Sequence, residues 1–229
     1  MGQALVLLFS GDPYVWSTIG VSLRVSGLAL VWATLLAFPL AALMTFKAFP
    51  GRNALRLLVY TGMGFPSVIV GLVVLLLLTR RGPLGQWGLL WTPQAMVLAQ
   101  GILIFPLLAG VALSALQAVD PLLAEAASTL GAKPWRQALL VMGVARQGLV
   151  TALLSGFGRA ISEVGAVLMV GGNIVWSSSV SYTRTLTTAI VVETRQGKFE
   201  TALALGFILF FLVFVVNLVV LRLGRSPQR

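Results

Sequence analysis

Long apolar runs alternate with short polar segments along most of this chain. Five of the runs are long enough to cross a hydrocarbon core about 30 Å thick, which needs roughly 20 apolar residues in a helix. The expected spans are residues 25–44, 57–79, 95–117, 148–170 and 201–221. The pattern therefore predicts an all-α polytopic membrane protein, with five transmembrane helices in a single transmembrane domain over residues 1–229.

Three of these apolar runs contain an internal proline. Pro39, Pro66 and Pro106 fall inside the first, second and third spans. Each removes a backbone hydrogen bond, and a helix bundle tolerates this loss when neighbours or water satisfy the freed carbonyl. We expect a kink in each of the three helices.

Composition agrees with the membrane assignment and disfavours an enzyme. Hydrophobic residues make up 58% of the chain and charged residues 10%, whereas soluble domains carry about 25% charged residues. The sequence contains no cysteine, no histidine and six acidic residues. The commonest general base and the thiolate metal ligands are therefore missing, and we expect no metal site and no catalytic residue.

The net charge of +10 is explained by topology rather than by a nucleic-acid partner, because cytoplasmic loops of membrane proteins are rich in Lys and Arg. With five spans and a cytoplasmic carboxyl end, the inside faces hold Lys47, Arg52, Arg56, Lys133, Arg136, Arg146, Arg222, Arg225 and Arg229. The outside faces hold Arg80, Arg81, Arg184, Arg195 and Lys198, partly offset by Asp12, Glu193 and Glu200. We therefore expect the N-terminus outside and the C-terminus in the cytoplasm.

A half-polar segment, residues 119–147, separates the third and fourth spans and is predicted to form a cytoplasmic helical hairpin. Asp120 and Pro121 favour a helix start, and Gly131 favours its end through a left-handed conformation. A helix of about ten residues is about 15 Å long and cannot cross a bilayer. Its polar face is not Lys/Arg-rich, as that of a lipid-anchoring helix would be, so docking into a groove of a partner protein is favoured.

The fourth span contains two charged residues. Arg159 and Glu163 are four positions apart and can pair on one helix face. An unpaired charge at that depth costs about 2.5–3.5 kcal/mol, so neither should face lipid. Three roles stay open: a buried ion pair that fixes packing, a gate whose pairing changes between states, and direct binding of an anion by Arg159.

Gly171, Gly172 and Asn173 close the fourth span at its predicted outer mouth. They could line the entry or dock an external protein, although glycine and asparagine also simply end helices. The following outer loop, residues 174–200, is rich in Ser and Thr and long enough to hold a short helix.

Two stretches carry a resemblance to a known family. Glu125-Ala126-Ala127, followed after three residues by Gly131, resembles the EAA motif of permease subunits from type I ATP-binding-cassette (ABC) importers. Members often continue to an Ile-x-Leu-Pro ending, where this chain has "VMGV" at 141–144. The stretch "GFGRAISEVGAV", followed by "MVGGNI", is most similar to tungstate-uptake permeases, near the molybdate and sulfate branch.

The resemblance implies the fold of methionine- and molybdate-type permeases and an alternating-access mechanism in a prokaryotic inner membrane. It implies a homodimer in membrane lipid, two ABC ATPase subunits and an extracytoplasmic oxyanion-binding protein, with tungstate or molybdate as the cargo, or another oxyanion such as sulfate. The ATPase would contact Glu125, Ala126, Ala127 and Gly131.

The energy source would lie outside this chain. No G-x-x-x-x-G-K-[ST] phosphate-binding loop occurs, and the nearest fragment, Gly197-Lys198-Phe199, lacks the first glycine and the hydroxyl residue. ATP and Mg²⁺ would therefore be bound by the partner ATPase, and no cofactor is expected here. The alternative is a secondary carrier or channel with Arg159 and Glu163 as an ion relay, which inverted repeats would support; none is evident in the sequence.

Overall fold

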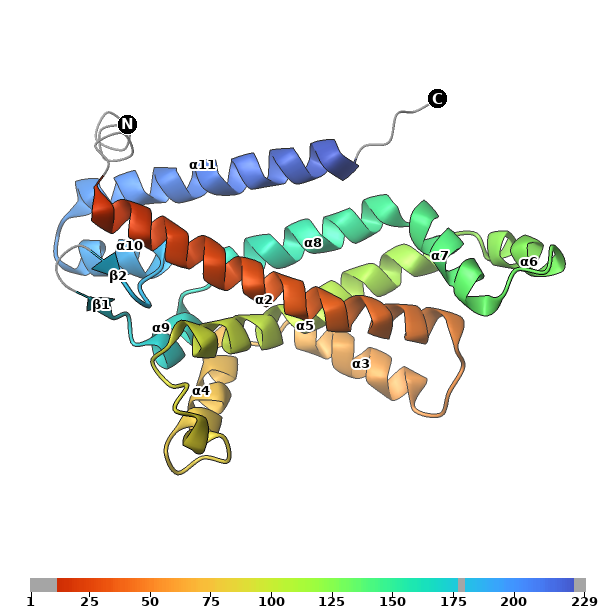
Figure 1. Cartoon of the computed structure of the whole chain (residues 1–229), viewed down its shortest axis with the longest axis horizontal. Coiled ribbons are helices and arrows are strands. Elements are labelled where there is room, and N and C mark those ends of the chain that lie inside the picture. The colour runs from red at the N-terminus through yellow and green to blue at the C-terminus, as the bar shows by residue number, and fades with distance from the viewer. Residues whose placement is uncertain (1–11, 177–179, 225–229) are drawn as a thin grey trace.

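A computed structural model describes residues 12–176 and 180–224. Arg225 and Arg229, and residues 177–179 of the predicted outer loop, lie outside the described residues. The helices are α2 (Pro13–Phe46), α3 (Arg52–Met63), α4 (Ser67–Leu78), η1 (Gly85–Trp87), α5 (Pro93–Gln117), α6 (Pro121–Thr129), α7 (Pro134–Val144), α8 (Arg146–Ile161), α9 (Gly165–Gly171), α10 (Leu186–Arg195) and α11 (Phe199–Gly224). One short antiparallel hairpin joins β1 (Val175–Trp176) to β2 (Val180–Ser181). The prediction of an all-α membrane protein is confirmed, apart from this hairpin (Figure 1).

Helix α2 starts earlier than the first predicted span. The Asp12 carboxylate caps it by accepting from the Tyr14 N–H at 2.8 Å, and Pro13 occupies its first position. The helix continues through Pro39 to Phe46. Alanines at every fourth position, Ala29, Ala33, Ala37 and Ala41, are fully buried and allow α2 to lie close along α5 and α8.

The second predicted span, residues 57–79, is two helices rather than one. Helix α3 ends at Met63 and α4 begins at Ser67, and the two are bent by 105°. Pro66 stands before α4 in an extended conformation, with ψ of 126°. Because proline also disfavours a helical conformation of the residue before it, the Gly64-Phe65-Pro66 sequence ends the helix where we expected only a kink.

The fourth predicted span, residues 148–170, is also interrupted. Helix α8 ends at Ile161 and α9 begins at Gly165, and α7 meets the start of α8 at an angle of 70°. Among the described residues, α2, α5 and α11 are each long and apolar enough to cross a membrane. The number rises to five if α3 with α4, and α7 with α8, each count as one bent span.

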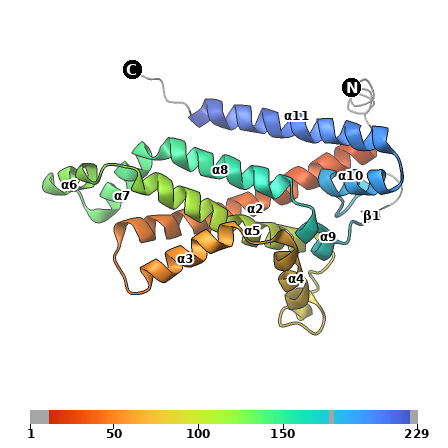
Figure 2. The ribbon, with the colours of Figure 1, turned by 180° about the vertical axis from the view of Figure 1, so that it is seen from behind.

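The core lies where α2, α5 and α8 pack together, and it includes Met44, Ile104, Leu108 and Leu113. A second cluster joins α4 and α9 to the first half of α5. The hairpin α6–α7 lies at one end of the elongated molecule, with the end of α11 on the same side. The start of α2, the β-hairpin and α10 lie at the other end (Figures 1 and 2). The fold therefore separates the predicted cytoplasmic hairpin, residues 119–147, from the predicted outer mouth at residues 171–173.

Candidate functional site

Helix α6 has well-defined ends that follow from its sequence. The Asp120 carboxylate accepts from the Leu122 N–H at 2.9 Å, and Pro121 is the first helical residue. At the other end Gly131 has φ of +79°. Its N–H donates to the Ser128 carbonyl, and the Ala132 N–H reaches back to Ala127, each at 2.9 Å, which is the Schellman arrangement. The predicted start and the left-handed end at Gly131 are both confirmed.

The same helix buries none of its residues within this chain. Leu122 and Leu130 are 65% and 87% exposed. Glu125 and Ala126 are exposed, while Ala127 is half-buried. A short helix is marginally stable alone and is normally held by packing, so α6 presents a surface that is incomplete without a further contact.

Glu125 lies in the middle of this surface. Within residues 12–176 and 180–224 it forms no hydrogen bond and no ion pair. Helix α6 is supported from one side by α7, which starts at Pro134 and leads into α8. The hairpin thus connects an exposed carboxylate directly to the interrupted fourth span.

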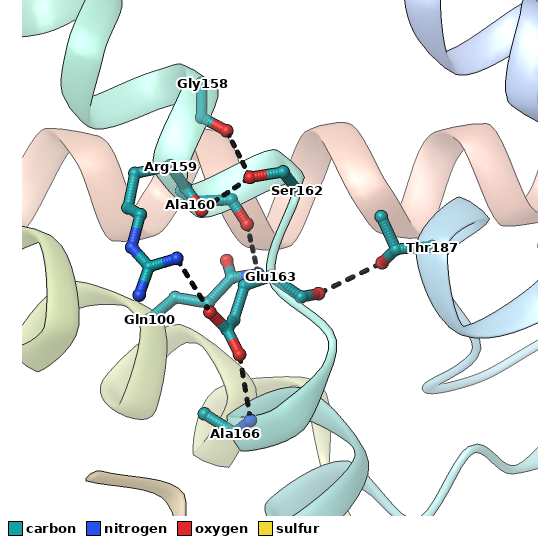
Figure 3. A network of polar contacts seen from close by, with 8 residues as sticks. All are labelled: Gln100, Gly158, Arg159, Ala160, Ser162, Glu163, Ala166 and Thr187. Atoms are coloured by element: carbon teal, nitrogen blue, oxygen red, sulfur yellow. Dashed lines mark hydrogen bonds and ion pairs between the residues drawn. The ribbon is translucent and has the colours of Figure 1, made fainter. Parts of the chain in front are cut away.

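At the interruption between α8 and α9 the structure brings Arg159 and Glu163 together. The guanidinium Nη1 lies 3.8 Å from the carboxylate Oε2 (Figure 3). Their spacing predicted that both residues would lie on one continuous helix, but they do not. Arg159 is in the last turn of α8, and Glu163 lies beyond its end. The positive charge of Arg159 also interacts favourably with the partial negative charge at the C-terminal end of α8.

The Glu163 carboxylate is almost fully buried, with 2% of its side chain exposed. Its Oε1 accepts from the Ala166 N–H at 3.0 Å, so it satisfies a free N–H at the start of α9. Glu163 therefore holds the break from both sides, by the ion pair with α8 and by the hydrogen bond to α9.

Sequence reasoning missed two residues that donate to carbonyls at the break. One of these carbonyls, that of Ala160, also accepts from the Glu163 N–H at 3.2 Å. The Gln100 amide donates to the Ala160 carbonyl at 2.9 Å, and the Thr187 hydroxyl donates to the Glu163 carbonyl at 3.0 Å (Figure 3). Gln100 is 1% exposed. A polar amide inside the apolar span 95–117 is unusual, so the sequence could have indicated that Gln100 has a specific role. Nothing in the sequence distinguished Thr187 from the other hydroxyl residues of its Ser/Thr-rich loop.

The predicted outer mouth is a tightly packed turn. Gly172 and Asn173 both have positive φ, 68° and 55°. A Cβ added to Gly171 would lie 2.8 Å from Met96 Cγ, and one on Gly172 would lie 2.6 Å from Trp91 Cε3. Ending the helix and allowing close packing therefore account for both glycines.

Asn173 has a second function in this turn, because its Oδ1 accepts from Arg184 Nε at 3.1 Å. Arg184 also donates to the Tyr14 hydroxyl at 3.2 Å. Sequence reasoning counted Arg184 among the outer charges but did not link it to Asn173. The turn thus fixes one cation beside the start of α2.

The described residues offer few groups that could bind a metal ion. Across the described ranges 12–176 and 180–224, no group of three or more His, Cys, Asp or Glu residues could hold a metal ion. The notable polar features are the exposed Glu125 on α6, the hydrogen-bonded break between α8 and α9, and the turn at Gly172 and Asn173.

Comparison with known proteins assigns these features to a family. Residues 29–228 match the model of the binding-protein-dependent transport system inner membrane component. A probable anion ABC transporter permease protein of Haloferax volcanii is 52% identical over 217 residues, 94% of each chain. The tungstate uptake system permease protein TupB of Peptoclostridium acidaminophilum is 38% identical over 223 residues, 97% of this chain and 96% of that one.

A solved structure shows the same fold. A chain of a bacterial ABC transporter involved in the import of the acidic polysaccharide alginate superimposes with a TM-score of 0.75. The match covers 99% of this chain and 84% of that chain at 21% identity. With the family model covering most of its length, this chain belongs to the binding-protein-dependent transport system inner membrane components, the membrane-embedded permeases of ABC importers.

Proposed function

We propose that this permease imports an oxyanion, with tungstate as the preferred cargo. The observation that carries the proposal is the 38% identity to a tungstate permease over almost the full length of both chains. The 52% identity to a probable anion permease supports the broader class. Molybdate is the nearest alternative, because both ions are tetrahedral dianions of similar chemistry.

The working unit is a homodimer with two ABC ATPase subunits and an extracytoplasmic oxyanion-binding protein. Cations cluster around the α6–α7 end of the chain, including Lys133, Arg136 and Arg146, which supports a cytoplasmic position for that end. The start of α2 would then be outside and the end of α11 in the cytoplasm.

Helix α6 is the contact through which the ATPase acts. Its exposed Leu122 and Leu130, its free Glu125 carboxylate and its lack of buried residues support docking to another protein. ATP and Mg²⁺ would be held by that ATPase. Movement of α6 would pass through α7 to α8, and the break at Glu163 would let the two parts of the fourth span reorient between inward- and outward-facing states.

The test is reconstitution of the permease with its ATPase and binding protein in proteoliposomes. We expect tungstate uptake that requires ATP and the binding protein, with molybdate as a competitor and sulfate as a weaker one. Uptake driven by a proton gradient without the ATPase would contradict the proposal, and preference for sulfate would reassign the cargo. A cross-link from Ala126→Cys to the ATPase tests the docking contact separately.

A further inference from the structure

One face of α8 is polar along its whole length. Starting at its first turn and ending at its C-cap, the polar positions on this face are Gln147, Thr151, Ser155, Arg159 and Ser162. They are spaced by four, four, four and three positions, so they share one side of the helix. We name this set the polar stripe.

The opposite face of α8 forms part of the core. Leu149, Ala152, Gly156 and Ala160 are buried there, where α8 packs against α5 and α2. On the polar stripe, Gln147, Thr151 and Ser162 are exposed, and the Arg159 side chain is 41% exposed. Helix α8 is therefore amphipathic although it forms part of a membrane span.

Two of the three hydroxyls of the polar stripe are satisfied within their own helix. Thr151 donates to the Gln147 carbonyl at 3.0 Å, and Ser162 donates to the Gly158 carbonyl at 2.8 Å. Their remaining lone pairs can accept from water. This pattern suits a face in contact with water inside the membrane better than a face packed against a second polar network.

The ion pair at the end of the polar stripe is oriented asymmetrically. The Glu163 side chain is 2% exposed and its carboxylate accepts from the Ala166 N–H, whereas the Arg159 side chain is 41% exposed. Their 3.8 Å separation exceeds hydrogen-bond length. Within the described residues Arg159 donates no hydrogen bond. The carboxylate therefore holds the cation in place and leaves its five donors available.

A guanidinium on a lipid-facing surface near the middle of a span is costly, so this surface must face water or protein. The positive fork of arginine matches the oxygens of a tetrahedral oxyanion. Partial neutralisation by Glu163 would keep binding weak, as passage requires, because an ion held too tightly would not leave.

We propose that the polar stripe of α8 lines the passage through which the anion crosses, and that Arg159 is the side chain that attracts it midway. This inference rests on the proposed function in one respect, the negative charge of the cargo. It commits to an inorganic oxyanion as the ligand of Arg159.

The absence of cysteine from the sequence permits a direct test. Single cysteines are placed at Thr151 and Ser155 on the polar stripe and at Leu203, which is 64% exposed on α11, as the matched control. The permease–ATPase complex in proteoliposomes is treated with membrane-impermeant methanethiosulfonates, one anionic and one cationic. We expect modification at both α8 positions, about 10-fold or more faster than at the control, since only water-lined sites admit a charged reagent.

Charge is tested in the Ser155→Cys background, one turn from Arg159. Arg159→Gln should lower the ratio of anionic to cationic reaction rates about 10-fold, because a local cation concentrates anions, whereas Arg159→Lys should retain most of it. Arg159→Gln/Glu163→Gln serves as a second variant without a stranded carboxylate, and it should also lower the ratio. ATP hydrolysis by each complex confirms that it is assembled.

Two outcomes would overturn the inference. If cysteines at Thr151 and Ser155 react as slowly as the one at Leu203, the polar stripe is packed against protein. If the ratio of anionic to cationic reaction rates is unchanged in Arg159→Gln, this arginine does not determine the electrostatic potential in the passage. Neither reading requires tungstate, so failure of tungstate uptake with labelling intact would contradict the proposed cargo alone.

Discussion

Helices α8 and α11 both expose a full face in this chain, but the two faces are chemically opposite. On α11 the exposed positions Leu203, Phe207, Phe210, Phe211, Phe214 and Leu218 are all apolar. On α8 the exposed face carries hydroxyls, an amide and the Arg159 guanidinium. Both helices belong to predicted spans of the same bundle.

The contrast shows that exposure has two meanings in a membrane protein. An apolar exposed face is compatible with lipid, whereas a face that carries the Arg159 guanidinium would be costly there. The exposed fraction of the side chains alone would not distinguish these two faces. The side chains distinguish the two helices: they favour lipid contact for α11 and, under our proposal, water contact for α8.

The largest expected effect comes from placing a charge on the wrong one of these faces. Phe211 is near the middle of α11 and is 60% exposed. Phe211→Arg should cost about 2.5–3.5 kcal/mol of insertion free energy, and the fraction of protein recovered in the membrane should fall. Thr151→Arg on α8 is the matched control and should insert nearly normally. Equal loss in both variants would abolish the distinction between the faces.

A smaller effect is expected from breaking the ion pair at the end of α8. Arg159→Ala should lower stability by about 1–3 kcal/mol, less than for a fully buried pair because the Arg159 side chain is 41% exposed. The loss arises because Glu163 keeps its buried charge. Thermal unfolding in detergent should therefore show Arg159→Ala/Glu163→Ala to be more stable than the single variant, and the reverse order would count against a stranded carboxylate.

The side-chain hydrogen bonds to carbonyls at the break between α8 and α9 should contribute still less to stability. Thr187→Val removes the donor to the Glu163 carbonyl and should destabilise by about 1 kcal/mol. Thr187→Ser keeps the hydroxyl and is the control. We expect only the valine variant to unfold at a lower temperature, and an equal shift in both would assign the effect to packing of the threonine methyl group.

The sequence predicted the features that depend on local rules. Apolar length located the long helices α2, α5 and α11. Asp120, Pro121 and Gly131 located both ends of α6, because capping and left-handed glycine are local properties. The proximity of Arg159 and Glu163 followed from helical spacing. The family resemblance, carried by the motif at Glu125 and by the stretch around Arg159, was confirmed by the relatives.

The features that the sequence did not predict depend on contacts between distant segments. At the interruption after Ile161, Gln100 on α5 donates to the Ala160 carbonyl and Thr187 on α10 donates to the Glu163 carbonyl. Such partners are visible only in the folded chain. The 105° bend before Ser67 was underestimated as a kink, since a proline can either bend or end a helix.

The smallest effect on stability, and a specific effect on function, is expected on α6, which is exposed like α11 but lies outside the membrane spans. Glu125→Lys reverses an exposed charge that forms no hydrogen bond or ion pair within the described residues, so the free energy of unfolding should change by less than about 0.5 kcal/mol. ATP-driven tungstate uptake should nevertheless fall, because the docked ATPase would meet the wrong charge. Glu125→Gln, which keeps the shape, should lose less. Unchanged uptake in the lysine variant would show that exposure of α6, unlike exposure of α8, carries no function.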